Sequence, residues 1–138
     1  MRIRKGVVWA IVLGLIFGVA TPVPAGSRFS DVTIERARAL VQARSGKSDF
    51  MVLDVRTPAE FAEGHLPGAI NVNGLGSDFE ARVSTFDRAR TYLVYCRTGN
   101  RSARAVQVLS RMGFRSVYHM FEGIMGWYKR GLPLSRPS

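Results

Sequence analysis

Cysteine is almost missing from this chain of 138 residues, because Cys96 is its only one. A lone thiol cannot form an internal disulfide. It also excludes any mechanism that needs a second, resolving cysteine in the same chain. Two uses of a single cysteine remain: a reactive role and pairing with another molecule.

Acidic residues are scarce as well. Ten Asp and Glu stand against 20 Lys and Arg, so the formal net charge is +10. Such a balance raises the question of nucleic acid or anionic lipid as a partner. The basic residues are scattered, however, without a long run and without interleaved aromatic residues. We therefore expect a solvated basic surface that favours small anions, and no nucleic-acid partner.

Internal repeats and low-complexity tracts are absent from the sequence. Its hydrophobic content of 46% and charged content of 22% are those of a globular protein and not of a disordered one. The length is sufficient for an ordinary core without disulfides. We expect one domain, residues 26–138, preceded by an extension, residues 1–25.

The extension has the pattern of a secretory signal peptide. Basic residues come first, residues 6–20 are uninterrupted and apolar, and residues 21–25 are small and helix-breaking. The apolar run is shorter than the ~20 residues that a membrane-spanning helix needs.

We expect cleavage after Ala25 or Ala20, which would remove three basic residues and no acid and lower the net charge from +10 to +7. The alternative is an uncleaved N-terminal anchor, and only then would the membrane be a partner. In both cases we expect the domain to be exported, to the periplasm or to the periplasmic face of the membrane.

Helix signals and apolar runs alternate along the domain. Thr57, Pro58 and Glu60 form a capping box with proline at the first helical position, which predicts a short helix that ends before Gly64. The patterns predict helices over 30–44 (capped by Thr33), 58–63, 77–84 (with a capping box at Ser77), 103–112 and 123–129, and strands over 50–55, 69–72, 91–95 and 114–119. This alternation is typical of an α/β domain. We expect a mostly parallel sheet of five strands, four of them at the ranges above, with helices on both faces.

The stretch around the cysteine, residues 95–102, lies between a strand and a helix. A free thiol has a pKa of about 8.5, and only the thiolate is a strong nucleophile. Backbone N–H groups at a helix N-terminus favour negative charge, and Arg97 and Arg101 add two cations. Gly99 lets the backbone curl into an anion-binding nest. We therefore predict that the loop activates Cys96 as a nucleophile and holds an anion.

Two further places in the sequence bear on this loop. Asp54 and Arg56 end a strand at the edge of the sheet where ligands bind, and we expect them to support the loop by hydrogen bonds and an ion pair. His65 is a candidate for a Cys–His pair, but we favour a structural histidine in a turn. His119 has no evident partner, and we expect it to have a core or surface role.

Residues 95–102 resemble the active-site loop of rhodanese-type sulfurtransferases. Residues 54–61 and 64–72 are similar to the first signature of that family, and residues 113–118 and 123–127 are similar to its closing one. The resemblance extends from Phe29 to the end of the chain. It implies the rhodanese fold, a persulfide on Cys96, and no metal or cofactor. The implied substrate-binding residues are Arg97, Thr98, Gly99, Asn100, Arg101 and Ser102, with Ser102 as a cap of the helix.

The resemblance implies sulfur transfer from a small anionic donor to cyanide or a thiol. Four residues separate Cys96 from Arg101, whereas cysteine phosphatases, including those with the rhodanese fold, have five. In the family the shorter loop accompanies sulfur chemistry, and a basic residue at Arg97 accompanies thiosulfate. The alternatives are a non-catalytic persulfide carrier or binding module and, less favoured, a cysteine phosphatase or arsenate reductase.

One position departs from the family pattern. Glu122 stands where the family usually has the first glycine of Gly-Gly-Ile. A side chain here could forbid a positive φ, and a carboxylate that pointed toward the loop would weaken anion binding.

Overall fold

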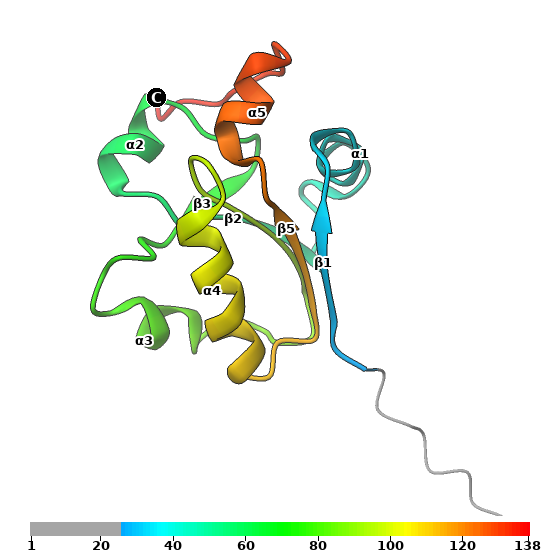
Figure 1. Ribbon diagram of the computed structural model, residues 1–138, viewed down its shortest axis with the longest axis vertical. Coiled ribbons are helices and arrows are strands. Elements are labelled where there is room, and N and C mark those ends of the chain that lie inside the picture. Colours follow the sequence, from blue (N-terminus) through cyan, green and yellow to red (C-terminus); the bar gives the residue numbers. More distant parts are fainter. Residues whose placement is uncertain (1–25) are drawn as a thin grey trace, which may run out of the picture.

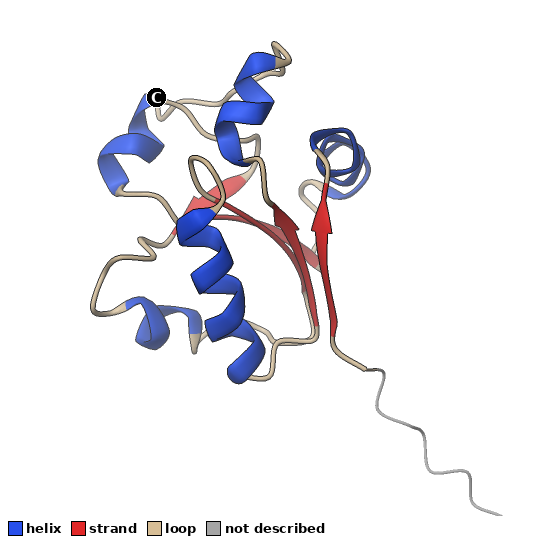
Figure 2. Cartoon of the chain, viewed as in Figure 1, coloured by secondary structure: helices blue, strands red, loops and turns tan. Residues whose placement is uncertain are grey.

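The computed structural model describes residues 26–138 (Figures 1 and 2). The predicted signal peptide or anchor, residues 1–25, lies outside the described residues. No helix within residues 26–138 is both long enough and apolar enough to cross a membrane. The elements are β1 Arg28–Val32, α1 Ile34–Arg44, β2 Phe50–Asp54, α2 Pro58–Glu63, β3 Ala69–Asn71, α3 Phe79–Val83, β4 Thr91–Tyr95, α4 Asn100–Arg111, β5 Ser116–Met120 and α5 Gly123–Lys129.

The strands form one five-stranded sheet in the order β1-β5-β4-β2-β3. Every neighbouring pair is parallel, so the predicted parallel sheet is confirmed. β4 is the central strand, and the chain leaves it directly into the cysteine loop. The carboxyl ends of parallel strands share one edge of the sheet, where ligands of open α/β sheets bind.

Helices cover both faces of the sheet, as predicted (Figure 1). Leu93 and Tyr95 of β4 belong to a buried cluster that includes residues of α1 and α5. Tyr92, Val94 and Cys96 belong to a second cluster, which includes residues of α3 and α4. Alternate residues of a strand point to opposite faces, and Cys96 therefore continues the face that α4 covers.

The segment before α1 differs from the prediction. Residues 30–32 were expected to open a helix, but Arg28–Val32 forms β1 and pairs with β5. Thr33 is the N-cap as expected, since its hydroxyl accepts a hydrogen bond from the N–H of Arg36 at 3.3 Å. β1 lies at the edge of the sheet, and only its last residue, Val32, is buried. A strand with so few buried side chains lacks the apolar run that would reveal it in the sequence.

One predicted capping box is confirmed and the other is wrong. The Thr57 hydroxyl accepts a hydrogen bond from the N–H of Glu60 at 3.3 Å, and the Glu60 carboxylate accepts one from the N–H of Thr57 at 3.4 Å, with Pro58 at the start of α2. α3, however, begins at Phe79, and its cap position is Asp78, whose side chain makes no capping bond. A helix of five residues, anchored by buried Phe79 and Val83, forms here without the predicted Ser77 box.

Candidate active site

The loop between β4 and α4 depends on two glycines in the left-handed region. Gly99 has a φ of 104° and directly precedes α4, and a β-carbon there would collide with the backbone ahead of α5. Gly123 has a φ of 66°, and a β-carbon there would collide with the carbonyl of Arg97. The N–H of Ile124 then donates to the carbonyl of Cys96 at 2.9 Å. The beginning of α5 therefore holds the loop backbone from one side.

Hydrogen-bond donors surround the sulfur of Cys96. The N–H of Gly99 donates to Sγ at 3.1 Å, and the hydroxyl of Ser102 lies 3.2 Å from Sγ. Only 1% of the cysteine is exposed. This burial alone would raise the pKa of the thiol, but hydrogen bonds from the Ser102 hydroxyl and from the backbone of Ser102, Gly99 and Thr98 outweigh it and lower the pKa. The loop therefore stabilises the thiolate although the residue is buried.

The remaining loop residues do not converge on the sulfur. Arg97, Thr98 and Asn100 are exposed, and only the backbone of Thr98 takes part in stabilising the thiolate. Ser102 is not the predicted helix cap. α4 begins two residues earlier, and the buried Ser102 hydroxyl instead lies within hydrogen-bond distance of Sγ and of the Gly99 carbonyl, at 3.1 Å.

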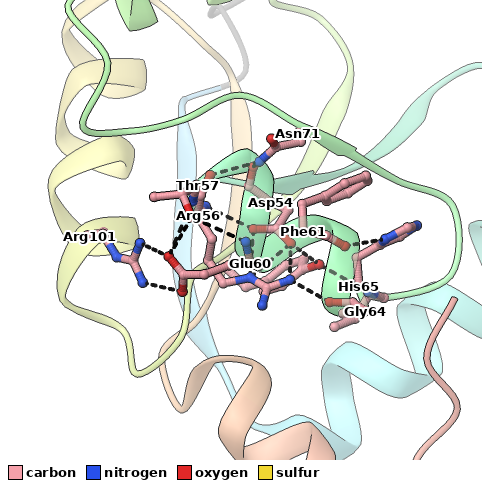
Figure 3. Close-up of polar contacts among 11 residues, drawn as sticks. Asp54, Arg56, Thr57, Glu60, Phe61, Gly64, His65, Asn71 and Arg101 are labelled. Atoms are coloured by element: carbon pink, nitrogen blue, oxygen red, sulfur yellow. Dashed lines mark hydrogen bonds and ion pairs between the residues drawn. The ribbon is translucent and has the colours of Figure 1, made fainter. Parts of the chain in front are cut away.

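Arg101 forms an ion pair with Glu60 of α2 (Figure 3). Two parallel hydrogen bonds join its guanidinium to the carboxylate, at 2.7 and 2.9 Å. The Arg101 guanidinium lowers the pKa of Glu60 to about 2, assisted by Thr57, although burial acts in the opposite direction. Arg101 is therefore a fixed positive charge near Cys96, already paired with a carboxylate.

Asp54 and Arg56 form a buried ion pair, with Nη2 2.6 Å from Oδ2 (Figure 3). Arg56 also donates to the carbonyl of Gly64 at 2.7 Å. The hydroxyl of Tyr95, the residue before Cys96, donates to the same Asp54 carboxylate at 2.7 Å. The pair thus ties the end of β4 to the turn after α2.

His65 lies in that turn and does not contact Cys96. Its Nδ1 is 3.0 Å from the carbonyl of Phe61, and its ring stacks on the Phe61 ring at 3.8 Å between centroids. Its backbone pairs with Ser135 near the C-terminus. This is the structural histidine that we favoured over a Cys–His pair.

His119 has partners that the sequence did not reveal. Its Nε2 is 2.7 Å from the hydroxyl of Ser102, and its Nδ1 is 2.9 Å from the carboxylate of Asp31 in β1. Ser102 in turn contacts Cys96. No local signal in the sequence could join these residues, because Asp31 and His119 meet only through the pairing of β1 with β5.

Glu122 does not disturb the loop. Its φ is −74°, so the position needs no glycine. Its carboxylate pairs with Arg130 at 3.0 Å, and Gly126 leaves room for its side chain. The concern that this carboxylate would repel an anion is therefore not supported by its geometry.

A cleft of about 260 Å³ lies beside the loop, with Arg97 in its lining. Apolar side chains of α5 and of the C-terminal segment line it, together with basic and acidic groups from both sides. The described residues include no group of three or more His, Cys, Asp and Glu that could hold a metal ion. The chemistry available to the site is that of a thiolate beside a cleft that carries Arg97 in its lining.

Comparison with known proteins identifies relatives of this loop and fold. Residues 37–130 match the family described as "Rhodanese-like domain". A sulfurtransferase of Allochromatium vinosum is 33% identical over 101 residues, which are 73% of this chain and 92% of that protein. Thiosulfate sulfurtransferase 16, chloroplastic, of Arabidopsis thaliana is 41% identical over 91 residues, which are 59% of this chain and 76% of that protein.

Solved structures agree with the fold. The crystal structure of a rhodanese-related protein from Thermoplasma volcanium superposes with a TM-score of 0.66 at 29% identity. The match covers 78% of this chain and 99% of that one.

The ion pair between Glu60 and Arg101 predicts a stability difference that depends on pH. The pKa of Glu60 is lower in the folded state than in the unfolded state, so its contribution is present above about pH 5 and is lost as the pH falls toward 2. We expect Glu60→Gln to lower the free energy of unfolding by about 1 kcal/mol at neutral pH, the scale of a partly exposed pair. The difference should shrink steadily as the pH falls from 5 through 2, as measured by urea unfolding.

Glu63→Gln is the matched control in the same helix, because that exposed carboxylate forms no ion pair with any of residues 26–138. A Glu60→Gln difference that stays constant from neutral to acidic pH would contradict the assigned pair.

Proposed function

The chain belongs to the family of rhodanese-like domains, and on this premise we propose that it is a sulfurtransferase that carries a sulfane sulfur as a persulfide on Cys96. The observation that carries the proposal is the ring of donors around a single sulfur, which lowers the pKa of that thiol in spite of its burial. A nucleophile must be ionised, and a persulfide, once formed, is an anion that needs the same donors.

The reaction has two steps. The Cys96 thiolate attacks the outer sulfur of the donor, a new S–S bond forms, and the old S–S bond of the donor breaks. With thiosulfate, sulfite leaves with the electron pair and a persulfide remains on the cysteine. Cyanide or a thiolate then attacks the outer sulfur and restores the Cys96 thiolate. Covalent exchange of this kind gives ping-pong kinetics.

Several features support thiosulfate as the donor. Arg97 is exposed at the cleft beside Cys96 and offers a positive charge to a doubly charged anion. The Arabidopsis relative is named a thiosulfate sulfurtransferase. The backbone N–H groups of residues 97–102 and the fixed charge of Arg101 complete the proposed anion site, with the side chains of Thr98 and Asn100 at its mouth. Because only 1% of Cys96 is exposed, a slim terminal sulfur is favoured over a bulky phosphate ester.

We also propose that the protein is exported. The support is the pattern of residues 1–25, a basic start followed by an apolar run and small residues. Cleavage would release the domain into the periplasm, and retention would anchor it to the membrane with the domain on the periplasmic side.

Replacing the sulfur nucleophile tests the function. In Cys96→Ser, we expect production of thiocyanate from thiosulfate and cyanide to fall to background, because a hydroxyl cannot replace the thiolate. Mass spectrometry of the wild-type protein after treatment with thiosulfate should show one added sulfur atom on the Cys96 peptide. The thermal unfolding midpoint of the variant serves as the control for folding.

The same assays separate the alternatives. A protein that takes up sulfur but turns over with neither cyanide nor thiols is a carrier. Hydrolysis of an aryl phosphate at a comparable rate would indicate a cysteine phosphatase. A donor panel with thiosulfate and 3-mercaptopyruvate tests the choice of donor, and faster turnover of mercaptopyruvate would refute it. Residual thiocyanate formation by Cys96→Ser would remove Cys96 as the nucleophile.

Export is tested with the full chain expressed in a Gram-negative host. We expect the protein in the periplasmic fraction, with an N-terminus that begins after Ala25 or Ala20. An intact chain in the membrane fraction indicates the anchored form. An intact chain in the cytosol would overturn the proposal of export.

A further inference from the structure

An unbroken row of hydrogen bonds leads from the sulfur of Cys96 to the surface of the protein. Ser102 Oγ lies 3.2 Å from Sγ, His119 Nε2 lies 2.7 Å from that oxygen, and Asp31 Oδ1 lies 2.9 Å from His119 Nδ1. The contact between Ser102 and His119 is the shortest of the three. Ser102 and His119 are buried, whereas the side chain of Asp31 is 70% exposed.

Three different elements supply Asp31, His119 and Ser102, the residues that continue the hydrogen bonds from Cys96. β1 and β5 lie side by side (Figure 1), and their register places Asp31 opposite His119. Ser102 comes from the first turn of α4. Positioned by the sheet and by α4, the imidazole reaches Cys96 only through the serine hydroxyl.

The chemistry of the groups limits where the protons can be. An ionised carboxylate only accepts, so Nδ1 of His119 carries a proton and donates it to Asp31. When the imidazole is neutral, Nε2 accepts the single hydroxyl proton of Ser102. The serine oxygen is then free to accept from the thiol. When the imidazole is charged, Nε2 donates to the serine oxygen, and the hydroxyl donates to the thiolate.

We propose that Asp31, His119 and Ser102 form a proton relay that takes the proton of the Cys96 thiol and holds it on the imidazole. The S–H bond of Cys96 breaks as an O–H bond forms on Ser102, and the original O–H bond of Ser102 breaks as an N–H bond forms at Nε2 of His119. The products are a thiolate and an imidazolium, and the net charge of the site does not change. Asp31 stays ionised and stabilises the imidazolium. The side chains of Asp31, His119 and Ser102 have a positioning role, because none of these side chains needs to touch the sulfur donor.

The surroundings of His119 favour this pairing of charges. The titratable groups that face it are Asp31 from β1 and, through Ser102, Cys96 from the loop after β4. β4 itself presents Val94 in register with His119. Arg101 of α4 is directed to Glu60. The carbonyl of Gly99 competes for the Ser102 proton at 3.1 Å, a longer contact than that to Nε2.

The relay rests on the proposed function only in that Cys96 must act as a nucleophile. It adds a reason why one buried thiol can ionise without a second cysteine or a direct base. It also predicts that the protonation states of Cys96 and His119 are linked, so that removing the imidazole changes the pH at which the cysteine becomes reactive.

The test is the pH profile of Cys96 alkylation by iodoacetamide, measured on the full chain. In His119→Gln the amide keeps hydrogen-bonding capacity but cannot take a proton. We expect the midpoint of the profile to rise by about one pH unit, with the alkylation rate near neutral pH reduced up to about tenfold and the alkaline plateau unchanged. His65→Gln is the matched control, because that ring contacts Phe61 and not the row, and its profile should coincide with the wild type.

Two further variants keep the test decisive. Asp31→Asn changes a largely exposed side chain, and we expect a smaller upward shift of the midpoint. Ser102→Ala removes the bridge, so adding His119→Gln to it should cause no further shift. If His119→Gln does not fold, the profile of Asp31→Asn decides. A profile of either variant that coincides with the wild type, or a full additional shift in the double variant, overturns the relay.

Alkylation requires no sulfur donor. A protein that shows the shifts but transfers no sulfur would refute the proposed function and keep the relay. A protein that transfers sulfur without the shifts would refute the relay and keep the proposed function.

Discussion

Burial and hydrogen bonding have opposite effects on the ionisation of one sulfur atom, and the rest of the site is built around that balance. A thiol shielded from water resists ionisation, because its charged form loses solvation. At Cys96 the N–H of Gly99 and the hydroxyl of Ser102 replace that solvation with donors already in place. Each donor requires a particular backbone shape, and this shape requires a glycine at position 99. The reactivity of the thiol is therefore a property of the fold around it.

The rest of the site holds the loop in this shape. From one side, α5 packs on it through Gly123, where any larger residue would collide with the loop carbonyl. The Asp54 carboxylate accepts hydrogen bonds from both Arg56 and Tyr95 and so anchors the end of β4. From α2, Glu60 holds Arg101 in a two-bond ion pair. Preorganised donors need no rearrangement when charge develops, and this is the general advantage of building an anion site from backbone and braced side chains.

Sequence patterns predicted features that span a few neighbouring residues and missed contacts between residues far apart in the chain. The cysteine loop with its glycine spans residues 95–102, and the capping box at Thr57 spans residues 57–60, so local spacing alone predicts each of them. Arg101 and Glu60 are 41 residues apart, and Asp31 and His119 are 88 apart. Arg101 could be recognised as a cation but not as one already paired. β1 was missed because an edge strand with only Val32 buried has no apolar run. Without β1, His119 had no visible partner.

At Cys96 the hydrogen bonds to the sulfur outweigh the effect of burial on the pKa of the thiol. The most direct measurement is the ultraviolet absorbance of the thiolate as a function of pH, recorded as the difference between the wild-type protein and Cys96→Ser. We expect the midpoint of thiolate formation to lie below the value of about 8.5 for a free thiol. A midpoint at or above that value would contradict it, because burial would then outweigh the hydrogen bonds.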